Sequence, residues 1–497
     1  MRKFTTVSFF LLCLFSFQYL YAADGYEIKV KINNLKKNDT IYLAYHMGTQ
    51  KYLRDTTILD EKLTGVFKGK EKLPGGIYLI VLPNKTYFDI IINEQFFSVE
   101  NDTTDFAKNF KSTGSPENKV FYDDLRFISE KAKKRSELDA ERKNEKTSET
   151  RKKAIEEEFK KIDNEVKEYR NAIVKNNPTF FYTKVLKMME DIEIPEAPKD
   201  DKGNIIDSNF QYKYYKQHYF DNIDFADDRL LRTPVLHGKV MNYIERLTPQ
   251  SPDSINVALD LVLSKAKANS EMFKFWLIDL LNFYAKSNIM GFDAIYVHLV
   301  ENYYAKGLAS WTDEADLYRI TDRAKKMKPT LIGQVAPKLV LMDNNGKYQD
   351  LYSVKAAYTL LYIYDPDCGH CKKETPKFLE AYHKIKEKGI DLKVFAVSTD
   401  HLVDGQDSTG MPKFKTKPEE INKWPNFIKE FKIEEWINVA DLYLQNNFRE
   451  VYDINSTPRA FLLDKDKKII AKRFAAEQFE QIMDDFYNRD KKEAEKK

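Results

Sequence analysis

The first long pattern in the chain is a strict alternation of apolar and polar residues. Tyr26, Ile28, Val30 and Ile32 alternate with charged residues over 26–32, which predicts a half-buried β-strand. Similar β-rich runs follow, separated by Gly, Pro and Asn turn residues. They cover residues 40–45, 66–68, 77–82, 87–92 and 96–99. The pattern predicts a small antiparallel β domain over residues 24–112.

After Gly114 the period changes to that of helices. Apolar residues recur at steps of three and four, first in a short series and then in a longer one, so each series forms one apolar seam. The two series are Phe121, Leu125, Ile128 and Ala132, and then Ile155, Phe159, Ile162, Val166, Tyr169 and Ile173. We expect a charged helical hairpin that turns at 144–148, with its Lys and Glu runs facing solvent.

Residues 195–215 read as a loop, and further amphipathic helices follow it. Their predicted ranges are 235–247, 253–268, 271–287 and 292–304. Residues 113–330 are therefore predicted to form an all-helical middle region. His218, His237 and His298 occur singly in it, without the spacing that a metal site needs.

The C-terminal segment, 331–490, alternates strand and helix signals. An apolar run at 357–364 predicts a buried strand, Cys368 begins a helix that runs to about residue 388, and 392–398 is a second buried strand. This strand-helix-strand order predicts a parallel βαβ unit. A hairpin over 459–464 and 468–473 and a helix over 476–487 complete an α/β domain, and residues 491–497 read as a charged tail.

The N-terminus has the three parts of a secretory signal peptide. Arg2 and Lys3 precede an apolar run over 7–20, and small residues at Ala22 and Ala23 provide a cleavage site. We expect residues 1–23 to be removed and the protein to be exported to the periplasm or cell envelope. An uncleaved membrane anchor is the alternative, and the run is short for a membrane span.

Charge and cysteine content narrow the range of functions that the sequence allows. The 80 Lys and Arg residues nearly cancel the 77 Asp and Glu residues, so no basic field favours nucleic acid. Of the three cysteines, Cys13 would leave with the signal peptide. The remaining two, Cys368 and Cys371, would close almost no loop as a disulfide, so their value is chemical rather than structural.

The Cys368-Gly369-His370-Cys371 sequence fits redox chemistry at the start of a helix. Oriented backbone N–H groups there favour a thiolate on Cys368, and Cys371 lies one turn later, where it can attack a mixed disulfide. His370 could add a positive charge beside the sulfur. Asp365 and Asp367 act in the opposite direction, and the sequence does not decide which effect is larger.

Other readings of the cysteine pair stay open at this point. A zinc half-site lacks a second ligand pair, and haem attachment would need a His where Lys372 stands. A thiol peroxidase would share the Ala336-Pro337 pair near the start of the C-terminal segment. An envelope binding or scaffold protein, in which the N-terminal 300 or so residues engage a partner, is the rival from another class. We predict no metal and no cofactor beyond the redox-active cysteine pair.

Several spaced features of 331–490 resemble the thioredoxin superfamily, and within it the TlpA-like and ResA-like thiol:disulfide interchange proteins. The matching residues are Gly333, Ala336-Pro337, Asp343, Gly346, Cys368 to Cys371, Glu374, Pro376 and Thr457-Pro458. The resemblance implies a thioredoxin-like fold, a cis Pro458 whose neighbouring backbone pairs with substrate, and a buried acid at Glu374 that is linked to proton transfer. Pro376 would kink the helix of the cysteines.

Two features depart from the family pattern. The Asp365-Pro366-Asp367 segment replaces an aromatic-rich stretch that ends in Trp, and a longer polar connection runs from about 400 to 420. The upstream layout resembles multidomain thioredoxin-like proteins of Bacteroidetes-type bacteria, whose first two domains have no assigned function.

The sequence thus predicts an exported thiol:disulfide oxidoreductase, with reduction as the favoured direction. Its catalytic residues would be Cys368, Cys371 and Glu374, and its substrate-binding residues Gly369, His370, Thr457 and Pro458. Its partners would be protein thiols and disulfides of the envelope and a membrane-bound or soluble thiol electron donor.

Overall fold

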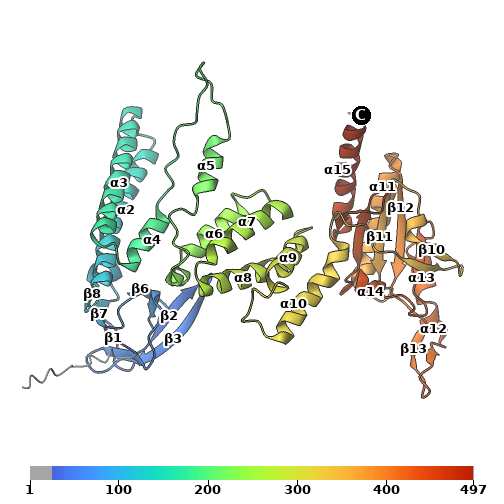
Figure 1. Cartoon of the computed structure of the whole chain (residues 1–497), viewed down its shortest axis with the longest axis horizontal. Helices are drawn as coiled ribbons and strands as arrows, with labels where there is room; N and C mark the ends of the chain where they lie inside the picture. The colour runs from blue at the N-terminus through green and yellow to red at the C-terminus, as the bar shows by residue number, and fades with distance from the viewer. Residues whose placement is uncertain (1–24, 496–497) are drawn as a thin grey trace, which may run out of the picture. The chain divides into compact units, whose positions relative to one another are not determined.

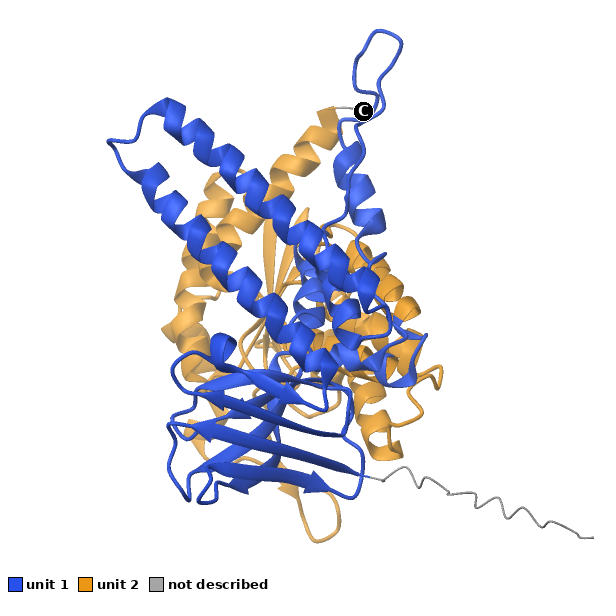
Figure 2. Ribbon diagram, turned by 90° about the vertical axis from the view of Figure 1, so that its left-hand side faces the viewer, with its two compact units in different colours: residues 1–247, 266–272 blue, residues 248–265, 273–497 orange. Residues whose placement is uncertain are grey.

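The computed structural model describes residues 25–495 (Figure 1). The predicted signal peptide over 1–23, Cys13 and the last two residues lie outside the described residues. The chain divides into two compact units, residues 1–247 with 266–272 and residues 248–265 with 273–497 (Figure 2). In the described part of the chain, no helix combines the length and the apolar composition that a membrane span requires.

The first unit begins with two four-stranded sheets, in the orders β4-β1-β7-β8 and β3-β2-β5-β6. Every pairing is antiparallel, as expected, except that of β1 with β7, which is parallel. In β1 the alternating apolar residues are buried, which confirms the period-two pattern. The elements are β1 (Tyr26–Asn33), β2 (Thr40–Met47), β3 (Gln50–Ile58), β4 (Thr64–Gly69), β5 (Gly76–Val81), β6 (Tyr87–Ile92), β7 (Phe96–Asp102), α1 (Phe106–Asn109) and β8 (Lys111–Thr113).

Two strands of these sheets were not predicted. Strand β3 lies at a sheet edge, and most of its side chains are exposed, including Leu53 and Ile58. Because it buries no face, its sequence carries no alternation of apolar and polar residues. Strand β8 has only three residues, too few for a periodic pattern.

The charged hairpin is present as predicted, with helices α2 (Pro116–Lys143) and α3 (Glu149–Asn176) joined through residues 144–148. Ser115 and Ser148 cap the helices, since each side chain accepts a backbone N–H of the first turn. Ile155, Phe159 and Ile162 pack with Leu138.

The first apolar series of the hairpin needs one correction. Ala132, expected in the seam, is exposed. Phe127 contributes instead, because its longer side chain reaches Tyr169, with ring centroids 4.1 Å apart. A stacked aromatic pair stabilises more than a single methyl group can at that position.

Buried polar groups join helix α2 to the sheet and to helix α4 (Phe181–Met189). The Asn118 side chain accepts the N–H of Ile91 at 2.8 Å and donates to its carbonyl at 2.7 Å, so it substitutes for a neighbouring strand. Glu117 accepts the Tyr182 N–H at 2.5 Å, and the Tyr182 hydroxyl donates to Asp124 at 2.6 Å. Buried hydrogen bonds of this kind favour one packing arrangement, although the second carboxyl oxygen of Glu117 has no partner among the described residues.

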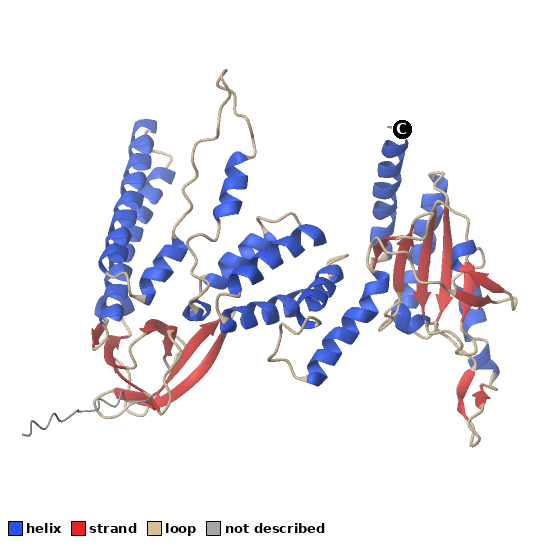
Figure 3. Ribbon diagram, viewed as in Figure 1, coloured by secondary structure: helices blue, strands red, loops and turns tan. Residues whose placement is uncertain are grey.

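Helices dominate the rest of the middle region, in blue in Figure 3. The four predicted helices are present, and α4, α5 and α10 were not predicted. Beyond α4 the elements are α5 (Phe210–His218), η1 (Asp228–Arg232), α6 (Leu236–Glu245), α7 (Pro252–Ala266), α8 (Ser270–Ala285), α9 (Asp293–Leu299), the π-helical turn η2 (Val300–Tyr304), α10 (Glu314–Met327) and η3 (Lys328–Thr330).

The C-terminal α/β domain is built on a seven-stranded mixed sheet of order β10-β9-β15-β12-β11-β16-β17. Strands β11, β12 and β15 are mutually parallel, which confirms the βαβ unit, and the other pairs are antiparallel. The strands are β9 (Val340–Asp343), β10 (Tyr348–Asp350), β11 (Tyr358–Tyr364), β12 (Leu392–Ser398), β15 (Ile437–Ala440), β16 (Arg459–Leu463) and β17 (Ile469–Lys472).

Strand β11 is buried along its whole length because both faces of the sheet are covered. Its even-numbered residues, such as Tyr362, belong to the core that includes helices α11 (Gly369–Glu387) and α15 (Ala476–Glu495). Leu361 and Ile363 belong to the core on the opposite face. The carboxyl end of a strand fixed in this way is a rigid support for the cysteine segment.

Shorter elements complete this domain and modify its predicted outline. The polar connection after residue 400 contains a two-stranded hairpin, and helix α15 continues to Glu495, beyond the predicted residue 487. The interior strand β15 was not predicted because it has only four residues. The remaining elements are η4 (Leu351–Ser353), β13 (Val403–Gln406), β14 (Pro412–Phe414), α12 (Pro418–Ile421), α13 (Lys423–Glu430) and α14 (Phe448–Val451).

The buried carboxyl of Glu117 makes stability depend on pH. Burial raises the pKa of Glu117 from 4.5 to about 7, so the folded state holds this proton more tightly than the unfolded state. Stability therefore falls as pH rises from about 4.5 to about 7, by roughly 3 kcal/mol for this group. We expect Glu117→Gln to weaken the decline in melting temperature between pH 5 and pH 8, measured by circular dichroism, whereas Glu145→Gln at an exposed position should not. Equal declines in all three proteins would contradict the assignment.

Candidate active site

Cys368 stands at the junction between strand β11 and helix α11. A tight turn of Asp365-Pro366-Asp367 follows the strand, with the Cys368 N–H donating to the Asp365 carbonyl at 3.1 Å and the Asp367 N–H donating to the Asp365 carboxylate at 2.8 Å. Cys368 is the N-cap residue of helix α11. Its sulfur therefore faces the free N–H groups of the first helical turn.

The surroundings of Cys368 favour its thiolate. Partial burial opposes ionisation, but hydrogen bonds from the Cys371 backbone, the Thr457 side chain, the Cys371 thiol and the His370 backbone together lower the pKa of Cys368 below its usual value of 9.0. These groups donate to a negatively charged sulfur and so stabilise it. The thiol is partly exposed, so a substrate can reach it.

Cys371 has the opposite character. Its side chain is fully buried, and burial raises the pKa of Cys371 from 9.0 to about 12, although the Asp365 N–H donates to its sulfur at 3.4 Å. The thiol therefore stays protonated and hydrogen-bonded to Cys368 at neutral pH. The two sulfurs, both free thiols here, are thus chemically unequal.

Thr457 and Pro458 come to the cysteines from a distant part of the chain. The Thr457–Pro458 peptide bond is cis, as the resemblance implies. The Cys368 thiol donates to the Thr457 carbonyl at 3.5 Å, and the Thr457 side chain forms hydrogen bonds that lower the pKa of both cysteines. Thr457 is thus a partner of the sulfurs themselves, a role that the sequence did not predict.

Gly369 and His370 lie in the exposed first turn of helix α11. A Cβ atom added at Gly369 would meet no atom within 4 Å, so the approach to Cys368 is open on that side. The structure also shows how His370 acts on the sulfur. Its backbone N–H contributes to the lowered pKa of Cys368, where the sequence had suggested its imidazole.

Glu374 lies one turn beyond Cys371, on the same helix. It is not a fully buried acid: its side chain is 20% exposed, and it forms an ion pair with Lys377 at 2.9 Å. Its second oxygen accepts the N–H of Ala476, the first residue of helix α15, at 3.2 Å. Pro376 lies inside helix α11, which continues to Glu387.

Two buried tyrosines behind the cysteines were not predicted as part of the site. The Tyr362 hydroxyl is 2.9 Å from that of Thr375, and Tyr364 accepts a hydrogen bond from Trp424 at 3.1 Å. Burial raises the pKa of both tyrosines. Their two-residue spacing on β11 was the available signal, because it places both rings on the face that carries helix α11.

The acidic residues before Cys368 do not reverse its preference for the thiolate. Lys423 pairs with the Asp367 carboxylate at 2.6 Å, and Asp365 contributes its backbone N–H to Cys371. The question that the sequence left open is therefore decided by hydrogen bonds to the sulfur. Over residues 25–495, no group of three or more His, Cys, Asp or Glu side chains is arranged to hold a metal ion.

Family models match three consecutive parts of the chain. Residues 332–472 match the AhpC/TSA family. Residues 26–121 match a domain of unknown function, DUF4369, and residues 142–329 match another, DUF5106.

Individual relatives match less than a third of the chain. The thiol-disulfide oxidoreductase ResA of Bacillus cereus is 26% identical over 151 residues, which is 30% of this chain and 74% of that protein. ResA of Bacillus subtilis is 27% identical over 138 residues, 28% of this chain and 64% of that protein.

Solved structures give similar matches. A domain of a possible thiol-disulfide isomerase from Cytophaga hutchinsonii is 35% identical, with 34% of this chain and 97% of that chain covered and a TM-score of 0.27. A thioredoxin-like protein from Bacteroides caccae is 21% identical, with 59% of this chain and 98% of that chain covered and a TM-score of 0.43.

The contacts of Thr457 lead to a test of how Cys368 is activated. Thr457→Val removes the hydroxyl but keeps the shape, so we expect the pKa of Cys368 to rise and its alkylation by iodoacetamide at pH 7 to slow by about threefold to tenfold. Thr457→Ser should restore the rate. The measurement is the pH profile of alkylation in a Cys371→Ser background. Identical profiles for the Thr and Val forms would show that the hydroxyl has no effect on the sulfur.

Proposed function

The C-terminal domain makes this chain a member of the thioredoxin superfamily, related to the ResA thiol-disulfide oxidoreductases, and from that membership we propose that it reduces disulfides of exported proteins through Cys368 and Cys371. The observation that carries the proposal is the inequality of the two sulfurs. One is accessible and favoured as a thiolate, and the other is buried and protonated next to it.

The reaction begins at Cys368. Its thiolate attacks one sulfur of a client disulfide, the client S–S bond breaks, and the other client sulfur leaves as a thiolate that takes up a proton. Cys368 and the client are then joined by a mixed disulfide. The Thr457 carbonyl, 3.5 Å from the Cys368 sulfur, lies where an extended client backbone could pair with it.

Cys371 completes the exchange. It loses its proton and attacks the Cys368 sulfur, which releases the client as a second thiol and leaves a disulfide between the two cysteines. The client gains two electrons and two protons, and an external thiol donor returns the pair to the reduced state. Glu374, one turn from Cys371, is the proposed acceptor of the Cys371 proton.

The N-terminal signature supports the proposal of export and of exported clients. Arg2, Lys3 and the apolar run that ends near Ala22 favour cleavage and transfer out of the cytoplasm. Outside the cytoplasm disulfides form and persist, so a thiolate enzyme has substrates there. We propose the periplasm or cell envelope as the location.

Substitution of either cysteine gives different expected results. Cys371→Ser should accumulate mixed disulfides between Cys368 and client proteins, because the step that releases the client is lost. Cys368→Ser should form none and should not reduce insulin. The measurement is nonreducing electrophoresis of envelope extracts, with the double Cys→Ser variant as the matched control.

Two results would contradict the proposal. The first is the absence of dithiothreitol-sensitive adducts in the Cys371→Ser variant. The second is consumption of hydrogen peroxide by the wild-type protein without reduction of insulin, which would indicate a thiol peroxidase.

A further inference from the structure

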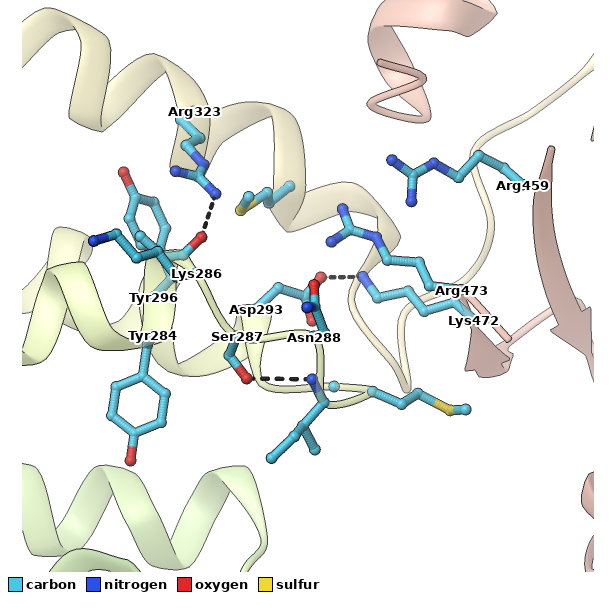
Figure 4. A pocket seen from close by; sticks show the side chains of 15 residues that line it. Tyr284, Lys286, Ser287, Asn288, Asp293, Tyr296, Arg323, Arg459, Lys472 and Arg473 are labelled. Carbon is cyan, nitrogen blue, oxygen red and sulfur yellow. Dashed lines mark hydrogen bonds and ion pairs between the residues drawn. The ribbon is translucent and has the colours of Figure 1, made fainter. Parts of the chain in front are cut away.

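A cavity of about 540 Å³ lies in the second unit, beside the strand that follows Pro458 (Figure 4). One wall is the loop 286–291 between helices α8 and α9 together with Arg323 of α10. The other wall is formed by Arg459 of β16 and by Lys472 and Arg473 at the end of β17. Cavities of this size hold a small molecule or a few side chains.

The charges that line this cavity are mostly positive. Five cations line it, Lys286, Arg323, Arg459, Lys472 and Arg473, and Asp293 is the one carboxylate among the residues of its wall. Lys472 already has partners, because it pairs with Asp293 and donates to the Thr330 carbonyl at 2.6 Å. The other four cations therefore have no carboxylate partner among the residues that line the cavity.

Arg459 shows this imbalance most clearly. Its Nε atom is buried and has no hydrogen-bond partner among the described residues. Burial and the neighbouring charge of Arg473 lower the pKa of Arg459, and the Asp453 carboxylate offsets only part of this effect. Arg473 itself reaches one carboxylate, that of Asp453, at 3.3 Å. An anion between the two guanidinium groups would supply the missing acceptor and relieve their mutual repulsion.

The cavity is close to the redox centre along the chain. Arg459 directly follows Pro458, and the Thr457 carbonyl contacts the Cys368 sulfur, so the sulfur contact and the cavity wall are two positions apart in the chain. Two residues span at most about 7 Å. Arg473 is held beside this strand because its N–H donates to the Ala460 carbonyl at 2.9 Å.

The helical wall is also connected to the same core. Met290, from the loop that lines the cavity, packs against the apolar cluster that includes Cys371 and that Cys368 also contacts. We expect the residues next to a client cysteine joined to Cys368 to lie near Arg459, because Arg459 is two positions beyond the Thr457 carbonyl that contacts the sulfur.

We propose that this cavity is an anion-binding subsite for the client, and that Arg459 and Arg473 hold a carboxylate of an acidic segment next to the client cysteine. The inference rests on the proposed function and deepens it, because it names acidic polypeptides as preferred substrates. Arg suits the role, since its planar fork binds a carboxylate through two parallel hydrogen bonds.

The test uses two short peptides that share one cysteine and differ only in Glu or Gln at the flanking positions. Each cysteine carries 2-nitro-5-thiobenzoate in a mixed disulfide. Attack by the Cys368 thiolate breaks that bond, joins the peptide to Cys368 and releases coloured thiobenzoate. We expect the Glu peptide to react about tenfold faster than the Gln peptide at low ionic strength, with the ratio falling as salt is added.

Variants locate the effect. Arg459→Gln or Arg473→Gln should bring the ratio of the two rates to within about twofold of one, as expected when a charge pair is lost. Lys286→Gln provides a second test on the opposite wall if an Arg variant does not fold. Lys465→Gln, an exposed lysine of the same domain that does not line the cavity, should keep the wild-type ratio.

The possible results separate the two proposals. Equal rates for both peptides in the wild-type protein, or an unchanged ratio in both Arg variants, would overturn the subsite while leaving thiol exchange intact. Failure of the wild-type protein to release thiobenzoate from either peptide would overturn the proposed function itself. A large Arg-dependent preference for oxidised glutathione without any preference between the peptides would overturn the assignment to acidic polypeptides.

Discussion

The chemistry of this protein depends on a set of hydrogen bonds that treats two neighbouring sulfurs differently. N–H groups at the start of helix α11 and the Thr457 side chain stabilise a thiolate on Cys368, while burial keeps a proton on Cys371. Attack on a client disulfide needs an accessible thiolate, and release of the client needs a second thiol beside it. Two exposed sulfurs, or two buried ones, would perform this pair of steps less efficiently. The rest of the domain can be understood as the support that maintains this difference.

That support comes from both faces of the sheet. Strand β11 is buried along its length, so the turn that follows it has little freedom, and the N–H of Asp365 in that turn meets the Cys371 sulfur. Strand β16 pairs with β11 in antiparallel register, which brings Pro458 to the carboxyl end of β11. The same pairing carries Arg459 into the cationic cavity, so the proposed subsite begins two positions beyond Thr457, whose carbonyl contacts the Cys368 sulfur.

The sequence predicted the elements with strong periodicity and the residues with distinctive chemistry. The helical hairpin, β11 and the Cys368 segment are examples, because each combines a long apolar pattern with clear end signals. Edge strand β3 and the short β15 were missed because neither carries a period of its own. Contacts such as that between Thr457 and Cys368, or the placing of Arg459 beside Arg473, could not be predicted from the sequence. They depend on which distant segments of the chain pair with one another. Glu374 shows the limit of resemblance, since its position matched the family pattern but its burial did not.

The central claim is the inequality of the two sulfurs, and residue-resolved alkylation tests it most directly. The reduced, folded protein would be exposed briefly to iodoacetamide at pH 7, unfolded in a second label, and digested for mass spectrometry. We expect the first label on Cys368 and the second on Cys371. Equal first labelling of both cysteines, or preferential labelling of Cys371, would contradict the account.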